Sequence, residues 1–400
     1  DTRVSNYSLL IDGLEKAYIS NTYDFYKRLS HKETLFNRLS VIRDFTYDNS
    51  KLTKIEQNCT GDGTHVYELG TDEQRRITSW RDSAKGYTVR YVYDSHGQLI
   101  RENNGQSGNT YVYEYDGIGN ITKVSKYPLT DGTITGNPQS KDVYTYSTTS
   151  PDVLASFNNK SITYDNAGCI TSFDGSSYTW TNGRLGTISW AERLDSTGKL
   201  TYFAKKKTIT YNGRGQRTRV KYTYTPGLIH EIDYMRSKIT DYSYDMRGRL
   251  VGESRTALYS DGDKVERELT YLYEGDEIIG LRYTVDNQTG LFYYDKNPFG
   301  DVIAILDQNG NAVAEYEYDA YGNCLEESGS NADLAGSNPI RYRSYYYDDD
   351  TGLYYLNARY YNPKLRRFIS PDNSAYLDTG SPQGLNLYVY CGNDPVSHTD

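Results

Sequence analysis

Aromatic and polar residues alternate along most of this chain, in short runs such as the Tyr-Val-Tyr that begins at Tyr91. A period of two places successive aromatic rings on one face of a β-strand. The run is followed by Asp-x-x-Gly, in which Asp can accept hydrogen bonds from backbone amides two residues on and Gly tolerates the positive φ of a tight turn. A second run, rich in Leu, Ile and Val, then follows. Each such unit is predicted to be a β-hairpin.

The unit recurs at intervals of roughly twenty to fifty residues, which is the range of repeat architectures. A lone hairpin is marginal in water, so successive copies are expected to pair into one continuous sheet whose tyrosine face forms a core. Twist, and the need to hide the edges, would make such a sheet curl around a cavity. The fold class predicted is all-β. Copies of the unit begin near Tyr47, Tyr91, Tyr113, Ile162, Tyr178, Ile209, Tyr242, Tyr271, Phe292 and Tyr316.

The chain divides into three parts on this pattern. Residues 1–45 have mixed apolar spacing that fits a helix or a weak strand, and they stay unassigned. Residues 46–335 carry the hairpin units, and residues 336–400 form a denser tyrosine-rich module. A start at Asp1 rather than Met suggests a fragment of a longer protein.

Composition narrows the possible functions. The chain has 44 tyrosines against 9 phenylalanines, so its packing surfaces are built from rings that also carry a hydroxyl. A net charge of −9 argues against nucleic-acid binding by this chain, because non-specific affinity depends on Lys and Arg. No run approaches the ~18 apolar residues of a membrane helix.

No cofactor or metal site is predicted. The four cysteines are far apart and form no Cys-x-x-Cys pair. The acidic run Asp348, Asp349 and Asp350 lacks the ligand spacing of a calcium loop, and we expect a hairpin turn there.

The repeated units resemble the YD repeats of the Rhs family, and the carboxyl-terminal stretch resembles the Rhs-associated core domain. Members of that domain typically show an ARYY-type segment, an RF-x-S-x-D segment, then NLY-x-Y and N-x-P-V before Asp-Pro-x-Gly-Leu. In this sequence they read Ala358 to Tyr361, Arg367 to Asp372, Asn386 to Tyr390 and Asn393 to Val396.

The resemblance implies a β-sheet shell that encloses a carboxyl-terminal toxin domain, as in bacterial polymorphic toxins, the C component of Tc toxins and, more distantly, teneurins. It implies that the partner is the toxin domain of the parent chain, together with further shell or delivery components. It also implies a secreted or cell-surface bacterial protein. In bacterial relatives the core domain is an aspartyl autoprotease that cuts after the Leu of Asp-Pro-x-Gly-Leu.

The same resemblance assigns three candidate catalytic residues. The first catalytic Asp falls on Asp372, the Asp that opens the cleavage motif falls on Asp400, and the arginine of the ARYY segment falls on Arg359. The chemistry is compatible, because two neighbouring carboxyl groups share a proton and can activate water and protonate a carbonyl. An arginine can orient one of them. The sequence stops at Asp400, ahead of the scissile bond, so cleavage is expected only in a longer parent.

Two other functions stay open. The repeats could form a surface adhesion or carbohydrate-binding array, or a scaffold in which the acids are only structural. An adhesin should display aromatic clusters outward, whereas a closed shell should expose few. We also expect Asp372 and Asp400 to approach one another near Arg359 if the site is proteolytic.

Overall fold

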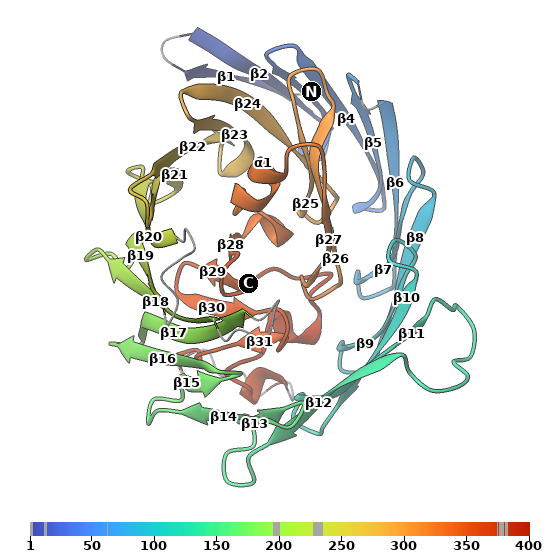
Figure 1. Ribbon diagram of the computed structural model, residues 1–400. Helices are drawn as coiled ribbons and strands as arrows, with labels where there is room; N and C mark the ends of the chain where they lie inside the picture. Colours follow the sequence, from blue (N-terminus) through green and yellow to red (C-terminus); the bar gives the residue numbers. More distant parts are fainter. Residues whose placement is uncertain are drawn as a thin grey trace.

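The computed structural model describes residues 3–11, 14–61, 63–194, 201–226, 235–373, 375, 380 and 383–400. Most of them belong to one antiparallel sheet of 27 strands. Each strand pairs with the next one in the sequence, so the sheet is a simple meander. Figure 1 shows that the sheet curls into a wall and that the carboxyl-terminal residues lie inside it. The all-β prediction, with a sheet wound around an interior, is confirmed.

The strands of the wall are β1 (Arg3–Ile11), β2 (Leu14–Tyr23), β3 (Leu29–Phe36), β4 (Leu39–Asp48), β5 (Lys51–Cys59), β6 (Gly63–Thr71), β7 (Ile77–Asp82), β8 (Tyr87–Tyr93), β9 (Leu99–Asn104), β10 (Asn109–Tyr115), β11 (Ile121–Pro128), β12 (Ser140–Tyr146), β13 (Leu154–Phe157), β14 (Lys160–Tyr164), β15 (Ile170–Phe173), β16 (Ser176–Thr181), β17 (Arg184–Leu194), β18 (Thr201–Tyr211), β19 (Arg217–Pro226), β20 (Met235–Tyr244), β21 (Leu250–Tyr259), β22 (Lys264–Glu274), β23 (Glu277–Val285), β24 (Gln288–Lys296), β25 (Val302–Leu306), β26 (Ala312–Tyr318) and β27 (Cys324–Ser328).

The interior module follows the wall. It contains the short helix α1 (Ala332–Ser337), a four-stranded sheet, and 3-10 turns at Tyr342–Ser344, Gln383–Leu385 and Cys391–Asn393. None of the helices in the described part of the chain is long and apolar enough to cross a bilayer. The strands of the smaller sheet are β28 (Tyr346–Asp348), β29 (Leu353–Leu356), β30 (Arg359–Asn362) and β31 (Arg367–Phe368).

The amino-terminal segment that the sequence left unassigned is part of the wall. Within residues 1–45, β1, β2, β3 and most of β4 pair in order, and β4 continues into the first recognisable repeat through its pairing with β5. Residue 45 therefore marks a change in the sequence pattern, and the sheet continues across it.

The repeated turn has the predicted chemistry. In the β8–β9 turn, the Asp94 carboxylate accepts hydrogen bonds from the backbone N–H groups of His96 and Gln98, both at 2.9 Å. Gly97 takes φ +84°, a conformation that a residue with a Cβ rarely adopts. The Asp116 turn of the next repeat repeats these bonds to Ile118 and Asn120.

A second hydrogen bond, which the sequence did not predict, explains the excess of tyrosine over phenylalanine. The tyrosine at the end of one strand donates its hydroxyl to a carbonyl near the start of the preceding strand, as Tyr115 does to Leu99 at 2.6 Å. A phenylalanine would pack equally well but could not make this bond. The same bond joins Tyr47 to Leu29, Tyr93 to Ile77, Tyr146 to Ile121, Tyr164 to Leu154, Tyr211 to Leu185, Tyr244 to Arg217, Tyr273 to Leu250 and Tyr318 to Val302.

The last strands of the wall return to the first ones. A hydrophobic cluster joins residues of β2 to β5, such as Phe36 and Leu39, to residues of β22 to β25, such as Tyr293 and Leu306. Buried polar contacts cross the same boundary, including Gln57 Nε2 to Asp295 Oδ1 at 2.8 Å. The sheet therefore overlaps itself and closes the wall around the module.

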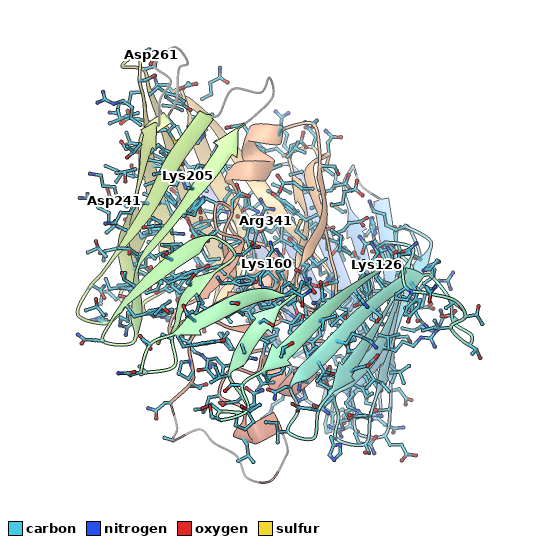
Figure 2. All side chains as sticks on the ribbon, turned by 60° about the horizontal axis from the view of Figure 1, so that its bottom comes forward. Lys126, Lys160, Lys205, Asp241, Asp261 and Arg341 are labelled. Carbon is cyan, nitrogen blue, oxygen red and sulfur yellow. The ribbon has the colours of Figure 1, made fainter. Side chains whose placement is uncertain are left out.

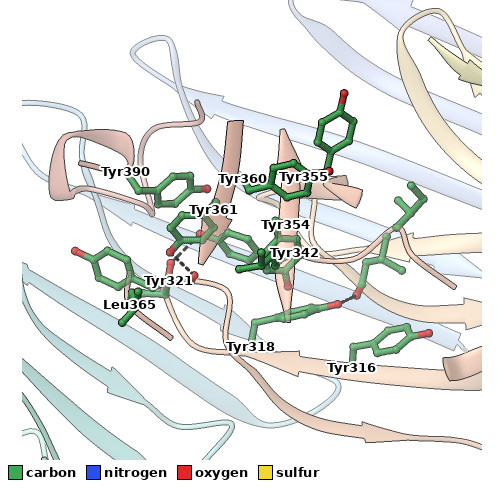
Figure 3. Close-up of a cluster of buried hydrophobic side chains, with 14 of the residues drawn as sticks. Tyr316, Tyr318, Tyr321, Tyr342, Tyr354, Tyr355, Tyr360, Tyr361, Leu365 and Tyr390 are labelled. Carbon is green, nitrogen blue, oxygen red and sulfur yellow. Dashed lines mark hydrogen bonds between the residues drawn. The ribbon is translucent and has the colours of Figure 1, made fainter. Parts of the chain in front are cut away.

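The module is attached to the wall by buried tyrosines. Tyr342, Tyr361 and Tyr354 donate their hydroxyls to the successive carbonyls of Ala320, Tyr321 and Gly322 in the β26–β27 turn, at 2.8, 2.7 and 3.0 Å. Figure 3 shows this cluster, in which the Tyr361 ring stacks on Tyr390 with centroids 4.1 Å apart.

Charged side chains lie on both the inner and the outer side of the wall. Arg341 is 1% exposed and lies within the wall, whereas Asp241, labelled in Figure 2, is half exposed on the outer side. The acidic run at Asp348 to Asp350 forms the β28–β29 turn, as predicted.

Candidate functional site

The three candidate catalytic residues come from three separate segments of the module. Arg359 is the first residue of β30, directly after the tight β29–β30 turn. Asp372 follows β31, and its backbone N–H donates to the Leu387 carbonyl at 2.9 Å. Asp400 lies beyond the last 3-10 turn, and its backbone N–H donates to the Tyr345 hydroxyl at 3.2 Å. Backbone hydrogen bonds therefore fix both acids to other parts of the module.

Arg359 brings the two acids together. Its Nη2 atom lies 2.8 Å from Asp372 Oδ2 and 3.7 Å from Asp400 Oδ2. Both carboxylates therefore lie beside the same nitrogen of one guanidinium. The structure thus has the approach of Asp372 and Asp400 near Arg359 that the sequence predicted. Their catalytic roles stay predictions.

The guanidinium is held in place from its other sides. Its Cζ lies 3.6 Å from the centroid of the buried Phe368 ring, which is a close cation–π contact. Its Nη1 donates to the Leu387 carbonyl at 3.4 Å, the carbonyl that also holds Asp372. Arg359 is therefore a rigid support for the pair of acids.

The site is partly buried. The side chains of Arg359, Asp372 and Asp400 are 17%, 33% and 27% exposed, so water reaches the carboxylates while much of their surface is covered. Burial raises the pKa of Asp400; Arg359 opposes this rise and the charge of Asp372 adds to it. Burial also lowers the pKa of Arg359, against the pull of the two acids, but a guanidinium stays charged in proteins.

Two supporting groups were missed by the sequence analysis. The Tyr345 hydroxyl bonds the main chain of Asp400, and the Leu387 carbonyl bonds both Arg359 and Asp372. Tyr345 is one of many tyrosines, and a backbone carbonyl has no sequence signature, so no signal distinguished either of them.

Metal-ligating side chains do not gather at this site. No cluster of three His, Cys, Asp or Glu residues suited to a metal ion occurs in the part of the chain that the structure describes. Cys59, Cys169, Cys324 and Cys391 form no disulfide with one another.

Comparison with known proteins identifies the fold. A family model described as the teneurin YD-shell matches residues 129–396, which include parts of both the wall and the module. A model of the RHS repeat matches residues 93–133.

Individual relatives agree with these matches. The chain is 33% identical over 316 residues to the tRNA3(Ser)-specific nuclease WapA of Bacillus spizizenii, covering 77% of this chain and 11% of that protein. It is 23% identical over 364 residues to the double-stranded DNA deaminase toxin A of Burkholderia cenocepacia, covering 85% of this chain and 22% of that protein. The chain thus spans about a tenth to a fifth of these curated relatives.

Solved structures show the same architecture. The crystal structure of TcdB2-TccC3 superposes on this chain with a TM-score of 0.74 at 20% identity. The superposition covers 100% of this chain and 21% of that one. TccC3 is also part of a solved structure of the Photorhabdus luminescens Tc holotoxin pore. The chain therefore belongs to the teneurin YD-shell family of Rhs/YD-repeat proteins.

Proposed function

We propose that this chain is part of an encapsulating shell which holds a toxin domain and, in a longer parent protein, frees it by aspartyl self-cleavage just downstream of Asp400. The observation that carries the proposal is the convergence of Asp372 and Asp400 on Arg359 within a module that the wall surrounds. The named relatives include a tRNA-specific nuclease and a DNA deaminase toxin, which supports a toxin as cargo. A shell of this kind would act outside the producing bacterium or at its surface.

The two acids suit different roles. Asp372 makes the closer ion pair with Arg359 and takes the part of the general base that activates a water molecule. Asp400, whose pKa is raised by burial, retains a proton and donates it to the oxygen of the scissile carbonyl. Water adds to the carbonyl carbon and its proton passes to Asp372. The C–N bond then breaks as Asp372 passes this proton to the leaving amine and the tetrahedral diol returns a proton to Asp400, leaving a new carboxyl terminus and a new amino terminus.

Surface exposure favours the shell over an adhesin. Among the described residues, the exposed large aromatic side chains are Phe25 and Tyr26, which sit together in the β2–β3 turn. The tyrosines of the repeats instead point into cores or bond to backbone carbonyls. An array built to stack on sugars would present such rings outward.

Expression of the parent protein, with its native downstream residues, tests both parts of the proposal. On a denaturing gel we expect two fragments, and in native size-exclusion chromatography we expect these fragments to elute together because the shell encloses the smaller one. A single band that persists in folded protein would refute self-cleavage. Two bands that separate on the native column would refute encapsulation.

A further inference from the structure

A cavity of about 330 Å³ lies beside Asp400, between the wall and the module. On the wall side it is lined by the β20–β21 turn, including Arg247 and Gly248, and by Asp276 of the β22–β23 turn. On the module side it is lined by Tyr345, by the β29–β30 turn and by Asp400 itself. Its size falls within the roughly 300–1,000 Å³ typical of ligand sites.

The cavity and the pair of acids share one hairpin turn. Leu356 and Asn357 form the cavity rim, and Arg359, two residues further on, holds Asp372 and Asp400. A chain lying in the cavity would therefore run next to Asp400, one of the two acids.

The main chain of Asp400 is held at the cavity by Tyr345. The Tyr345 hydroxyl accepts from the Asp400 N–H at 3.2 Å and lies 3.4 Å from its carbonyl oxygen, and Tyr345 lines the cavity. The Tyr345 ring packs edge-on against Tyr342 and Tyr354, which fixes the hydroxyl. Consecutive Cα atoms lie about 3.8 Å apart, so the first residue after Asp400 would be at the cavity and four residues would reach at most about 14 Å.

The lining matches an extended polypeptide. Its base consists of the rings of Tyr242, Tyr346 and Tyr355, which surround the buried Arg217 at 4.6, 4.3 and 4.5 Å and offer an apolar surface. At the rim, the Arg247 guanidinium makes no hydrogen bond or ion pair to another residue that the structure describes. It can therefore donate to main-chain carbonyls.

Arg249, the other arginine of this turn, already has partners within the wall. Arg249 pairs with Asp245 at 2.7 Å and also contacts the Gly275 carbonyl. Arg249 thus stabilises the β20–β21 turn, and Arg247 remains available to the cavity that it lines.

We propose that this cavity is the binding site for the polypeptide that follows Asp400, held as an extended main chain against the tyrosine base, with Arg247 as a donor at the rim. The proposal rests on the proposed function, in which the parent continues past Asp400. It adds the place where the segment to be cut lies and the residues that position it.

Disulfide trapping tests this site without relying on cleavage. The parent carrying Asp372→Asn, which stays uncut, and Cys324→Ser, which removes the one cysteine that is not buried, receives Arg247→Cys. A second cysteine is placed in turn at each of the first four positions after Asp400. Under mild oxidation we expect a cross-link at one or more of these positions, because a disulfide forms only where the two Cα atoms come within about 7 Å.

Arg214→Cys is the matched control. Arg214 occupies the same position of the preceding repeat turn, between Gly213 and Gly215, and it is exposed but does not line the cavity. Cross-linking from position 247 with none from position 214 supports the site. Folded protein that cross-links from neither position, or equally from both, overturns it. A cross-link from position 247 in a parent whose unsubstituted form never cleaves would refute the proposed protease and leave the cavity assignment standing.

Discussion

Asp372 and Asp400 lie against the same guanidinium nitrogen of Arg359, at 2.8 and 3.7 Å, although they come from separate segments of the module. Burial raises the pKa of Asp400, and the charge of Asp372 adds to this rise while Arg359 opposes it. The positive charge of Arg359 offsets the repulsion between the two carboxylates and lies closer to Asp372 than to Asp400. The following predictions depend on this arrangement and on the wall that surrounds it.

Replacing Arg359 should stop self-cleavage in the parent. In Arg359→Ala the acids lose their common anchor, and we expect the cleavage rate to fall by ~100-fold or more, the scale at which positioned acid–base groups contribute. Arg359→Lys keeps a charge but not the two-sided contact with the acids and Leu387, so it should give an intermediate rate. Densitometry of fragments during refolding measures both rates. Cleavage by Arg359→Ala at the native rate would contradict the arrangement.

The cleavage rate should fall as pH rises through the raised pKa of Asp400. Burial favours the protonated form of this acid, and only that form can donate a proton to the carbonyl. The loss of activity on the alkaline side therefore reports the deprotonation of Asp400, above the ordinary pKa of an aspartate. The rate is measured by refolding the parent from urea at a series of pH values. A rate that climbs steadily with pH would show that Asp400 is not the acid.

Asp348 should be essential for stability because it neutralises two buried cations. It contacts Arg217 Nη1 at 2.9 Å and Lys207 Nζ at 2.6 Å, and both cations are at most 1% exposed. Asp348→Asn removes the ion-pair partner of Arg217 and leaves Lys207 with only Asp350, at 3.7 Å, which should lower the free energy of unfolding by about 3–5 kcal/mol.

The control for Asp348 is Asp241→Asn, which breaks the surface pair between Asp241 and Arg219. Their side chains are 45% and 56% exposed, so solvent screens the pair and the loss of stability should be much smaller than that of Asp348→Asn. Urea unfolding followed by tyrosine and tryptophan fluorescence compares the two. Equal small losses would mean that the buried ion pairs do not hold the module to the wall.

The repeated tyrosine hydroxyl should contribute separately from its ring. Tyr273→Phe keeps the ring but leaves the Leu250 carbonyl without its 2.9 Å hydrogen bond, and we expect a loss of about 1 kcal/mol. Tyr259→Phe is the matched control, since the Tyr259 hydroxyl has no hydrogen bond to another described residue and should lose almost nothing. Urea midpoints of the two variants decide the question; indistinguishable midpoints would assign the tyrosine preference to packing alone.

The sequence predicted the hairpin of each repeat because the signal is local. Asp94 and Gly97 act within one turn, and alternation fixes the face of each ring, so both features can be read over a few residues. Within residues 1–45 the signal is incomplete, because the Asp24 turn makes the same bond to Arg28 but has Lys27 where other turns have Gly. The strands β1 to β4 form as their backbone groups pair with neighbouring strands. Their strand state is decided by tertiary context, which a local pattern does not contain.

The candidate site likewise has residues that the sequence predicted and residues that it did not. Asp372, Asp400 and Arg359 were found because family motifs mark their positions, and spacing alone would not have joined them. Tyr345 and the Leu387 carbonyl were missed because their roles depend on how distant segments pack. The overlap of β22–β25 with β2–β5 was likewise hidden, since contacts such as Gln57 to Asp295 join residues far apart in the sequence.

Intact-protein mass spectrometry of the purified parent tests the central claim most directly. It is run beside Asp372→Asn, Asp400→Asn and the control Asp261→Asn, an exposed acid in the β21–β22 turn. We predict two masses that sum to the parent plus one water for the unsubstituted protein and for Asp261→Asn, and one uncut mass for each of the other two variants. A correctly folded Asp372→Asn or Asp400→Asn protein that cleaves like the parent would contradict the claim that these two acids perform the cut.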